Sequence, residues 1–143
     1  MSLGNTFEND LLKLILQAVA IADLAQDDGS GPLTSLYVAL HTADPGEAGD
    51  QTTSEATYTS YARVAVVRSA SGWTVSAAVG SNAAAINFPA CTGGSNTITY
   101  ASIGWAASGA SKIIVSGALS ASLAVSSGIT PSFAIGALTF TLD

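Results

Sequence analysis

The chain has 143 residues, of which 48% are hydrophobic and 10% are charged, and its formal net charge is -6. This length suits one compact domain, and the composition excludes a disordered chain, which combines low hydrophobicity with high charge. The acidic balance opposes nucleic-acid binding, which needs a basic surface. Only four of the fourteen charged residues lie after residue 56. The surface of that part is therefore made of Ala, Ser, Thr and Gly, which suits burial against another chain.

The first expected element is an amphipathic helix from about residue 6 to residue 26. Asn5 and Glu8 have the spacing of a capping box at its start. Its apolar face has residues at intervals of three and four, namely Phe7, Leu11, Leu14, Ala18, Ile21 and Ala25. Leu12, Leu16 and Val19 widen this face, so we expect them to contact a neighbouring subunit. The helix is too short and polar to span a membrane, and no basic region precedes it, so neither membrane insertion nor secretion is expected.

After the Gly- and Pro-containing segment 27–32, strand and turn patterns alternate to the end of the chain. We therefore expect a helix and linker over residues 1–31 and a β domain over residues 32–143, together forming a single structural unit. The expected strands are 35–42, 58–69, 73–75, 84–88, 97–105, 112–115, 119–125 and 133–142. Their short spacing predicts a mainly β fold, an antiparallel β-sandwich or barrel with one N-terminal amphipathic α-helix.

Two sets of residues in the β part are further interface candidates. In the strand 119–125 apolar residues alternate with Ser120 and Ser122, so one side is core and the other is flat and uncharged, without the lysines that discourage edge association. Arg63 and Arg68 are five residues apart and face opposite sides of a regular strand. Each is expected to pair with an acid of the N-terminal segment or a neighbouring chain, the alternative being an ordinary solvated arginine.

The search for catalytic and metal-binding groups is largely negative. His41 is the sole histidine, and although the loop after it contains Asp44, Glu47 and Asp50, a strand-end histidine beside a solvated acidic turn is the favoured interpretation. Cys91 is the sole cysteine, so no intrachain disulfide forms, and a structural role is favoured. We expect no catalytic residue, no cofactor and no metal site. Trp73 and Trp105 suit a core, an interface or a platform for carbohydrate.

Three segments carry a resemblance to a known group of proteins. They are residues 36–46 (LYVALHTADPG), residues 61–63 (YAR) and the Gly-punctuated residues 116–142. These segments, within a region of about residues 35–142, resemble small β-rich virion proteins of tailed bacteriophages. The resemblance implies a structural protein of the virion, assembled in the bacterial host cytoplasm, and it transfers no catalytic residues. It does not choose between capsid decoration and a tail fibre.

The leading hypothesis is a non-enzymatic capsid decoration (cement) protein, because the chain has neither the repeats nor the coiled coil of a long fibre. Its expected partner is the major capsid protein or another virion protein, and a homotrimer is favoured. The alternative is a small tail or tail-fibre protein that contacts other tail proteins or a host receptor. A cell-wall hydrolase using Glu47 or Glu55 is a third, disfavoured hypothesis, because the second half of the chain is poor in charge.

Overall fold

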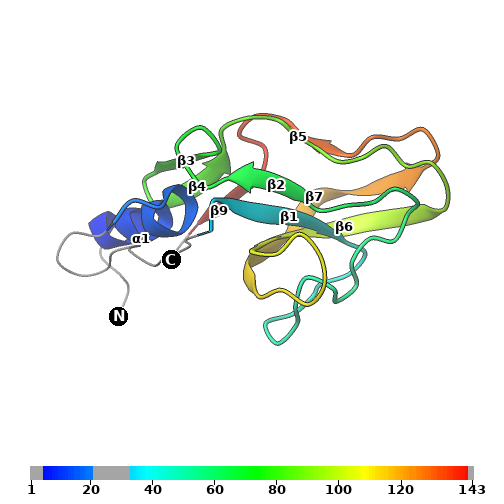
Figure 1. Cartoon of the computed structure of the whole chain (residues 1–143), viewed down its shortest axis with the longest axis horizontal. Helices are drawn as coiled ribbons and strands as arrows, with labels where there is room; N and C mark the ends of the chain where they lie inside the picture. Colours follow the sequence, from blue (N-terminus) through cyan, green and yellow to red (C-terminus); the bar gives the residue numbers. More distant parts are fainter. Residues whose placement is uncertain (1–4, 21–32, 142–143) are drawn as a thin grey trace. The chain divides into compact units, whose positions relative to one another are not determined.

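The computed structural model describes residues 5–20 and 33–141, with side chains from residue 9 onward, and is mainly β (Figure 1). The chain forms two compact units, each built from segments distant in the sequence. Unit 1 takes its residues from 1–35, 66–86 and 133–143, and unit 2 from 36–65 and 87–132. The expected division into 1–31 and 32–143 stays a prediction, because most of the expected linker lies outside the described residues.

The described elements are one helix and nine strands. In chain order they are α1 (Asn5–Gln17), β1 (Ser35–His41), β2 (Val64–Val67), β3 (Trp73–Ser76), β4 (Val79–Asn82), β5 (Ile86–Asn87), β6 (Ser95–Gly104), β7 (Ile113–Ser126), β8 (Ser132–Phe133) and β9 (Thr139–Thr141). The strands form three sheets with the orders β2-β1-β6-β7, β3-β4-β9 and β5-β8. The expected mainly β, antiparallel fold with an N-terminal helix is confirmed, and the described sheets are open and do not close into a barrel.

Several strand boundaries differ from expectation. The expected strands 112–115 and 119–125 are one continuous strand, β7, because Gly117 is tolerated inside it. The expected strand 133–142 is broken into β8 and β9 by a turn, in which Ala137 N–H donates to the Ala134 carbonyl. The expected strand 58–69 retains only β2. Strand β4, with the sequence VGSN, was not expected, because Gly, Ser and Asn are weak strand formers.

Helix α1 packs on β3 and β4 within unit 1 and is shorter than expected. It ends at Gln17, because Ala18 takes a left-handed conformation (φ 56°) and residues 18–20 are not helical. The expected continuation over residues 21–26 lies outside the described part of the chain. Leu12 and Leu16 are fully buried, whereas Leu11 and Leu14, on the face expected to be the main apolar one, are half-buried. The buried side of the helix is therefore centred on Leu12 and Leu16, beside the apolar face that the sequence predicted.

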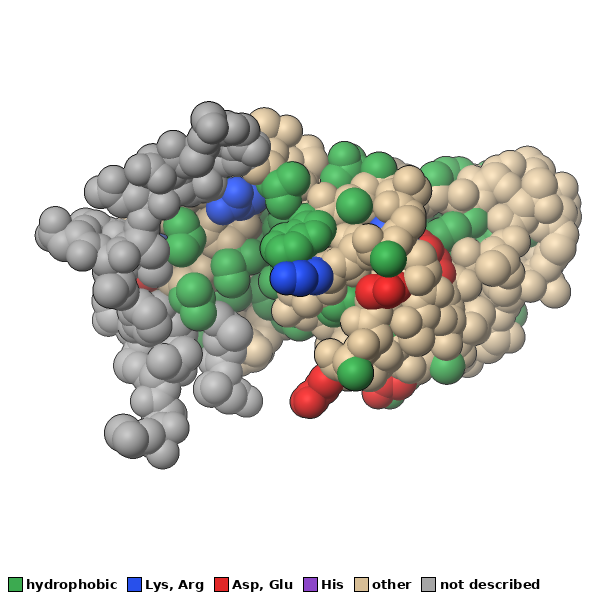
Figure 2. Space-filling model, turned by 60° about the horizontal axis from the view of Figure 1, so that its bottom comes forward, with side chains coloured by type: hydrophobic (Ala, Val, Ile, Leu, Met, Phe, Trp, Pro, Cys, Tyr) green, Lys and Arg blue, Asp and Glu red, His purple; other side chains and the backbone are tan. Residues whose placement is uncertain are grey.

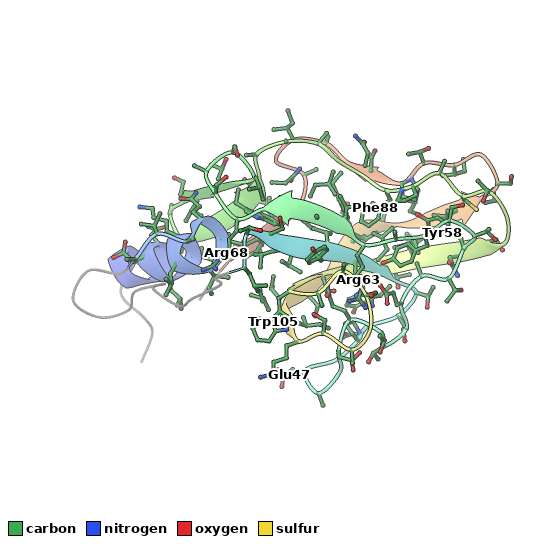
Figure 3. All side chains as sticks on the ribbon, viewed as in Figure 1. Glu47, Tyr58, Arg63, Arg68, Phe88 and Trp105 are labelled. Carbon is green, nitrogen blue, oxygen red and sulfur yellow. The ribbon has the colours of Figure 1, made fainter. Side chains whose placement is uncertain are left out.

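Arg68 holds the C-terminal end of this helix. Its Nε donates to the Ile15 carbonyl at 2.5 Å, and its Nη2 donates to the Leu14 carbonyl at 2.6 Å (Figure 3). The last carbonyls of a helix have no partner inside the helix, so a cationic side chain placed there satisfies them and interacts favourably with the helix dipole. The side-chain amide of Gln17 adds a hydrogen bond to the Trp73 carbonyl at 2.8 Å. These contacts attach the helix end to the rest of unit 1.

In unit 2 the strands β1, β6 and β7 form the scaffold. β1 pairs antiparallel with β6, from Tyr37 opposite Gly104 to His41 opposite Tyr100. The four residues from Val38 to His41 are all buried, so this central strand is covered on both faces. The other buried side chains of this unit include Ile98, Ile103, Phe88, Tyr58, Cys91 and Val125. The loops described next extend from this buried centre.

Candidate functional site: the paired loops of unit 2

Two loops of unit 2, residues 42–57 and residues 105–112, lie against each other, and we call them the paired loops (Figure 1). Gln51 N–H donates to the Ser111 carbonyl at 3.0 Å, and Asp50 and Lys112 form an isolated antiparallel bridge. The Ser111 hydroxyl accepts hydrogen bonds from the N–H groups of Trp105 and Ala106, at 3.2 and 3.1 Å. The second loop is therefore held at both of its ends.

The buried side chain of Arg63 hydrogen-bonds to both of the paired loops. Its guanidinium group forms a bidentate pair with Glu55, with Nε–Oε1 at 2.6 Å and Nη2–Oε2 at 2.8 Å. Its other donors reach Gln51 Oε1 at 3.3 Å, the Ala106 carbonyl at 3.0 Å and the Gly109 carbonyl at 2.9 Å. All five N–H donors of the side chain are thus used. Because this side chain is only 1% exposed, the network is an internal brace of unit 2.

His41 forms a second buried contact between β1, β6 and the first loop. Its Nδ1 lies 2.9 Å from the Thr53 carbonyl, and its Nε2 lies 2.7 Å from Ser102 Oγ. Because a carbonyl only accepts, Nδ1 carries the proton and Nε2 accepts the hydroxyl hydrogen of Ser102. Burial lowers the pKa of His41, so its imidazole is neutral near pH 7.

Gln51 completes this buried polar centre. Its amide donates to the Tyr37 carbonyl at 2.9 Å and to Ser102 Oγ at 3.3 Å. A glycine is required at position 104, where the Gln51 side chain lies against β6. A Cβ added there would lie 2.3 Å from Gln51 Oε1 and 2.7 Å from the Lys112 carbonyl oxygen. The absence of a side chain at this position lets the first loop sit directly on β6.

Tyr61 connects the network to β1. Its hydroxyl donates to Glu55 Oε1 at 3.0 Å and accepts the Leu40 N–H at 3.0 Å. Burial raises the pKa of Tyr61 far above its ordinary value, so the phenol stays protonated. Its ring stacks on Phe88 with centroids 6.4 Å apart. We call the set of His41, Gln51, Glu55, Tyr61, Arg63 and Ser102 the buried polar centre.

The serine and histidine of this centre have the geometry of a nucleophile and its base, but they are closed off. Ser102 is 2% exposed and His41 is 0% exposed, so a substrate has no access to either of them. The hydroxyl oxygen of Ser102 is also occupied by the Gln51 amide. Cys91, the other nucleophile type, is likewise buried, with its Sγ 3.2 Å from the Gly93 carbonyl. The arrangement serves to fix the loops in place.

The outer surface of the paired loops is accessible. Trp105 is 41% exposed, and Lys112 Nζ lies over its ring, 5.5 Å from the centroid, in cation–π geometry. A nearby part of unit 2 has a hollow of about 430 Å³, lined by Asp44, Gly46, Glu47, Tyr100 and residues 113–116. In Figure 3, Glu47 and Trp105 point outward on the same side of this unit. An aromatic ring, a cation and two carboxylates are thus presented on braced loops.

The residues predicted as interface candidates have different environments. Leu12, Leu16 and Arg63 are buried inside their units, and Arg68 hydrogen-bonds to helix carbonyls. Val19 is 47% exposed, and the two candidate serines of β7, Ser120 and Ser122, are exposed. An interface role for all seven stays a prediction.

Sequence reasoning did not identify Ser102, Gln51 and Glu55 as partners of His41 and Arg63. His41 contacts Thr53 and Ser102 rather than the nearby acids Asp44, Glu47 and Asp50. Ser102 is distant in sequence and no local pattern marks it. The only available signal was that His41 and Arg63 both lie in the segments that carried the family resemblance. Among the described residues, no group of His, Cys, Asp and Glu is placed to hold a metal ion.

The fold and the site define a β-rich protein with exposed, braced loops and an enclosed His41, Ser102 and Cys91. The chain matches the family described as podophage GP4 fiber I protein gp80 over residues 2–141, and it belongs to this family of bacteriophage tail-fibre proteins. No curated protein matches it. The expected identity as a structural protein of a tailed-phage virion is confirmed. The family favours the tail-fibre alternative over capsid decoration. Within the described ranges, no helix is long and apolar enough to cross a membrane.

Proposed function

We propose that this fibre protein acts by adhesion without catalysis, and that the paired loops of unit 2 contact a host receptor or another tail protein. The observation that carries the proposal is the exposed Trp105 on a braced loop. Binding residues are often found on loops held by a rigid scaffold, and tryptophan is enriched among residues that dominate binding energy. Because Arg63 and Ser111 already order these loops, little conformational entropy is lost when a partner binds.

The non-catalytic part of the proposal rests on the position of the reactive groups. The buried polar centre contains the only histidine, and its imidazole and the Ser102 hydroxyl are enclosed. Asp44 and Glu47 line the open hollow together with Tyr100 and Ser116, whereas the histidine lies apart from it in the buried polar centre. Such carboxylates are suited to accept hydrogen bonds from a partner's hydroxyl, amide or ammonium groups.

The test is binding of the fluorescently labelled, purified chain to two targets: cells of the bacterium on which the phage grows, and phage particles lacking this protein. Trp105→Ala is compared with Ile129→Ala, since both side chains belong to unit 2 and both are 41% exposed. We expect Trp105→Ala to weaken binding to one target at least tenfold and Ile129→Ala to leave it within twofold. Binding to cells identifies a receptor contact, and binding to particles identifies a tail contact.

Two results would overturn the proposal. One is equal binding by the two variants, which would place the contact elsewhere on the molecule. The other is release of sugars or peptides from host cell walls by the wild-type chain, abolished by Glu47→Gln, which would make the protein an enzyme.

A further inference from the structure

Strand β7 has an open edge. It is the end strand of the sheet β2-β1-β6-β7, so among the described residues only β6 pairs with it. Most of its second half is exposed, and Leu119 and Leu123 are only half-buried. No charged residue occurs from residue 113 to residue 142. An uncharged, uncovered edge is a template for pairing with another strand.

The middle of β7 is also irregular in its pairing with β6. Ile98 is opposite Leu123 and Tyr100 is opposite Ala118, so Leu119–Ser122 bulge out opposite a single residue of β6. The register therefore gives these four residues no partners in β6. The N–H and C=O groups that point to the outer edge of β7 are separate from those that face β6, and they need hydrogen-bond partners when another chain covers them. A second strand along the outer edge would supply these partners.

The sequence of this bulged region is self-complementary. Residues 118–124 read ALSASLA, which is the same in both directions about Ala121. When two copies of a strand run antiparallel about a twofold axis, each residue faces the one at the same distance on the other side of the centre. With Ala121 at the axis, Leu119 faces Leu123 of the other copy, and Ser120 faces Ser122. Every pair in this stretch thus joins residues of the same type.

We propose that two copies of this chain associate through antiparallel pairing of their β7 edges, with Ala121 of each copy at the twofold axis. The half-buried leucines would complete each other's burial, and the serines would face each other as hydroxyl pairs, which favour cross-strand contact. This inference does not depend on the function proposed for the paired loops, which lie outside the self-complementary stretch.

Charge favours this edge as the surface on which two copies meet. Each chain carries a net charge of -6, and nine of its ten acidic residues precede residue 57. Two copies therefore repel each other wherever their acidic surfaces approach. Strand β7 contains no acidic residue, so pairing of two β7 edges places no carboxylates of this strand against each other. A basic partner would have no acidic residue of β7 to pair with, so a second copy fits this edge better.

The size of the contact predicts a reversible dimer. The stretch from Ser116 to Ser126, which overlaps in this register, is at most about 37 Å long, because its bulge makes it shorter than a fully extended strand. A strip of that length and about 10 Å wide, twice the strand spacing, covers roughly 370 Å² per copy. The total of roughly 740 Å² is below the ~1,200 Å² of a standard stable interface. The dimer should therefore form and dissociate with concentration.

The test combines light scattering with cysteine cross-linking of the full chain. Ala121 and Ala118 are both exposed, and the native Cys91 is buried and does not react first. In the proposed register, the cysteine of Ala121→Cys faces the same cysteine of the other copy, whereas the cysteine of Ala118→Cys faces Ala124 of the other copy. We expect wild-type mass to rise toward a dimer with concentration, and Ala121→Cys to form a disulfide-linked dimer at least tenfold faster than Ala118→Cys. Circular dichroism of both variants checks that they are folded.

Charge substitutions provide a second readout. Ser120→Glu with Ser122→Glu places like charges opposite each other and should abolish the dimer, whereas Ser120→Lys with Ser122→Glu places opposite charges together and should retain it. The proposal is wrong if the wild type stays monomeric at all soluble concentrations, if it forms a trimer, or if the two cysteine variants cross-link at equal rates.

Discussion

Arg63 shows how a single side chain organises the loops of this fibre protein. Its five donors are matched to a carboxylate, an amide oxygen and two backbone carbonyls. The planar fork of guanidinium suits such a set, whereas an ammonium group has three donors at one point. The residue belongs to the YAR segment that is distinctive in the sequence, and its role in the brace gives that segment a physical meaning.

The first prediction concerns this brace. Arg63→Lys should destabilise the protein by about 3 kcal/mol, because it leaves the Glu55 carboxylate, whose side chain is 17% exposed, and two carbonyls without their full set of partners. The free energy of unfolding measured in denaturant checks this. Lys112→Arg, on the exposed second loop, is the control and should change stability by less than about 0.5 kcal/mol. A loss below 1 kcal/mol for Arg63→Lys would show that the brace contributes little.

The second prediction concerns pH. The pKa of His41 in the folded protein is lowered below its ordinary value of 6.5, mainly by burial. Between these two pKa values the unfolded chain binds more protons, so stability should fall as pH drops from about 7.5 to 5.5, by at most ~1.4 kcal/mol per pH unit. Asp50 also has a lowered pKa, but it titrates below pH 3.8, outside this range.

His41→Gln is the variant that isolates this effect. It should be less stable than the wild type at pH 7.5, yet its free energy of unfolding should change less between pH 7.5 and 5.5. If the wild type and this variant have the same pH dependence, another group is responsible.

At the scale of elements, α1 depends on Arg68 for its end. Arg68→Ala should destabilise the protein by about 2 kcal/mol, because it removes charge-assisted hydrogen bonds from two helix carbonyls. Lys13→Ala, on the same helix but away from these bonds, is the control. Denaturant unfolding gives the stability change, and far-ultraviolet circular dichroism reports the helix. Equal effects of the two variants would contradict the capping role.

The hairpin between β3 and β4 predicts a stabilising change. Its two turn residues, Ala77 and Ala78, both have positive φ, at 49° and 62°. This is the conformation of a type I′ turn, which favours Asn and Gly and costs other residues about 1 kcal/mol each. Ala77 is exposed, so Ala77→Asn should raise stability by about 0.5 kcal/mol, measured as a higher melting temperature. Exposed Ala70→Asn should produce no such gain.

The elements that sequence patterns predicted well are those with strong local signals. β1 has seven consecutive residues rich in strand formers, and its predicted and observed bounds differ by one residue. The C-terminal region was less predictable, because its Gly and Ser residues allow both strand and turn. The helix end was also misplaced, since it depends on Ala18 taking a left-handed conformation and on Arg68, which lies 53 residues from Ile15 in the chain.

For the whole molecule, the uneven distribution of charge is the dominant property. The surface drawn in Figure 2 has few red and blue side chains between large uncharged areas. The absence of repeats favoured a compact cement protein over a fibre, but a tail fibre also contains small subunits, and a subunit does not need the length of the assembly. The family match therefore favours the tail-fibre alternative over the cement protein.

The charge distribution leads to a prediction about self-association. Because two copies carry like net charges and the proposed β7 contact contains none, raising the salt concentration from 0.05 to 0.5 M should strengthen the dimer several-fold, as the screening length falls from over 10 Å to about 4 Å. Sedimentation at several protein concentrations measures this. The Ser120→Lys, Ser122→Glu variant is the contrast, because salt should weaken its charge pairs. Weakening of the wild-type dimer by salt would indicate ion pairs in the contact.

The sequence by itself determined the mainly β class, the N-terminal helix, the uncharged second half and the likeness to phage virion proteins. These follow from composition and local periodicity, which depend only on neighbouring residues. The tertiary structure decided which polar groups meet: His41 with Ser102, Arg63 with Glu55 and the second loop, and Arg68 with the helix end. It also left the β7 edge open. Such contacts join residues far apart in the chain, and their geometry exists only after the strands and loops have packed.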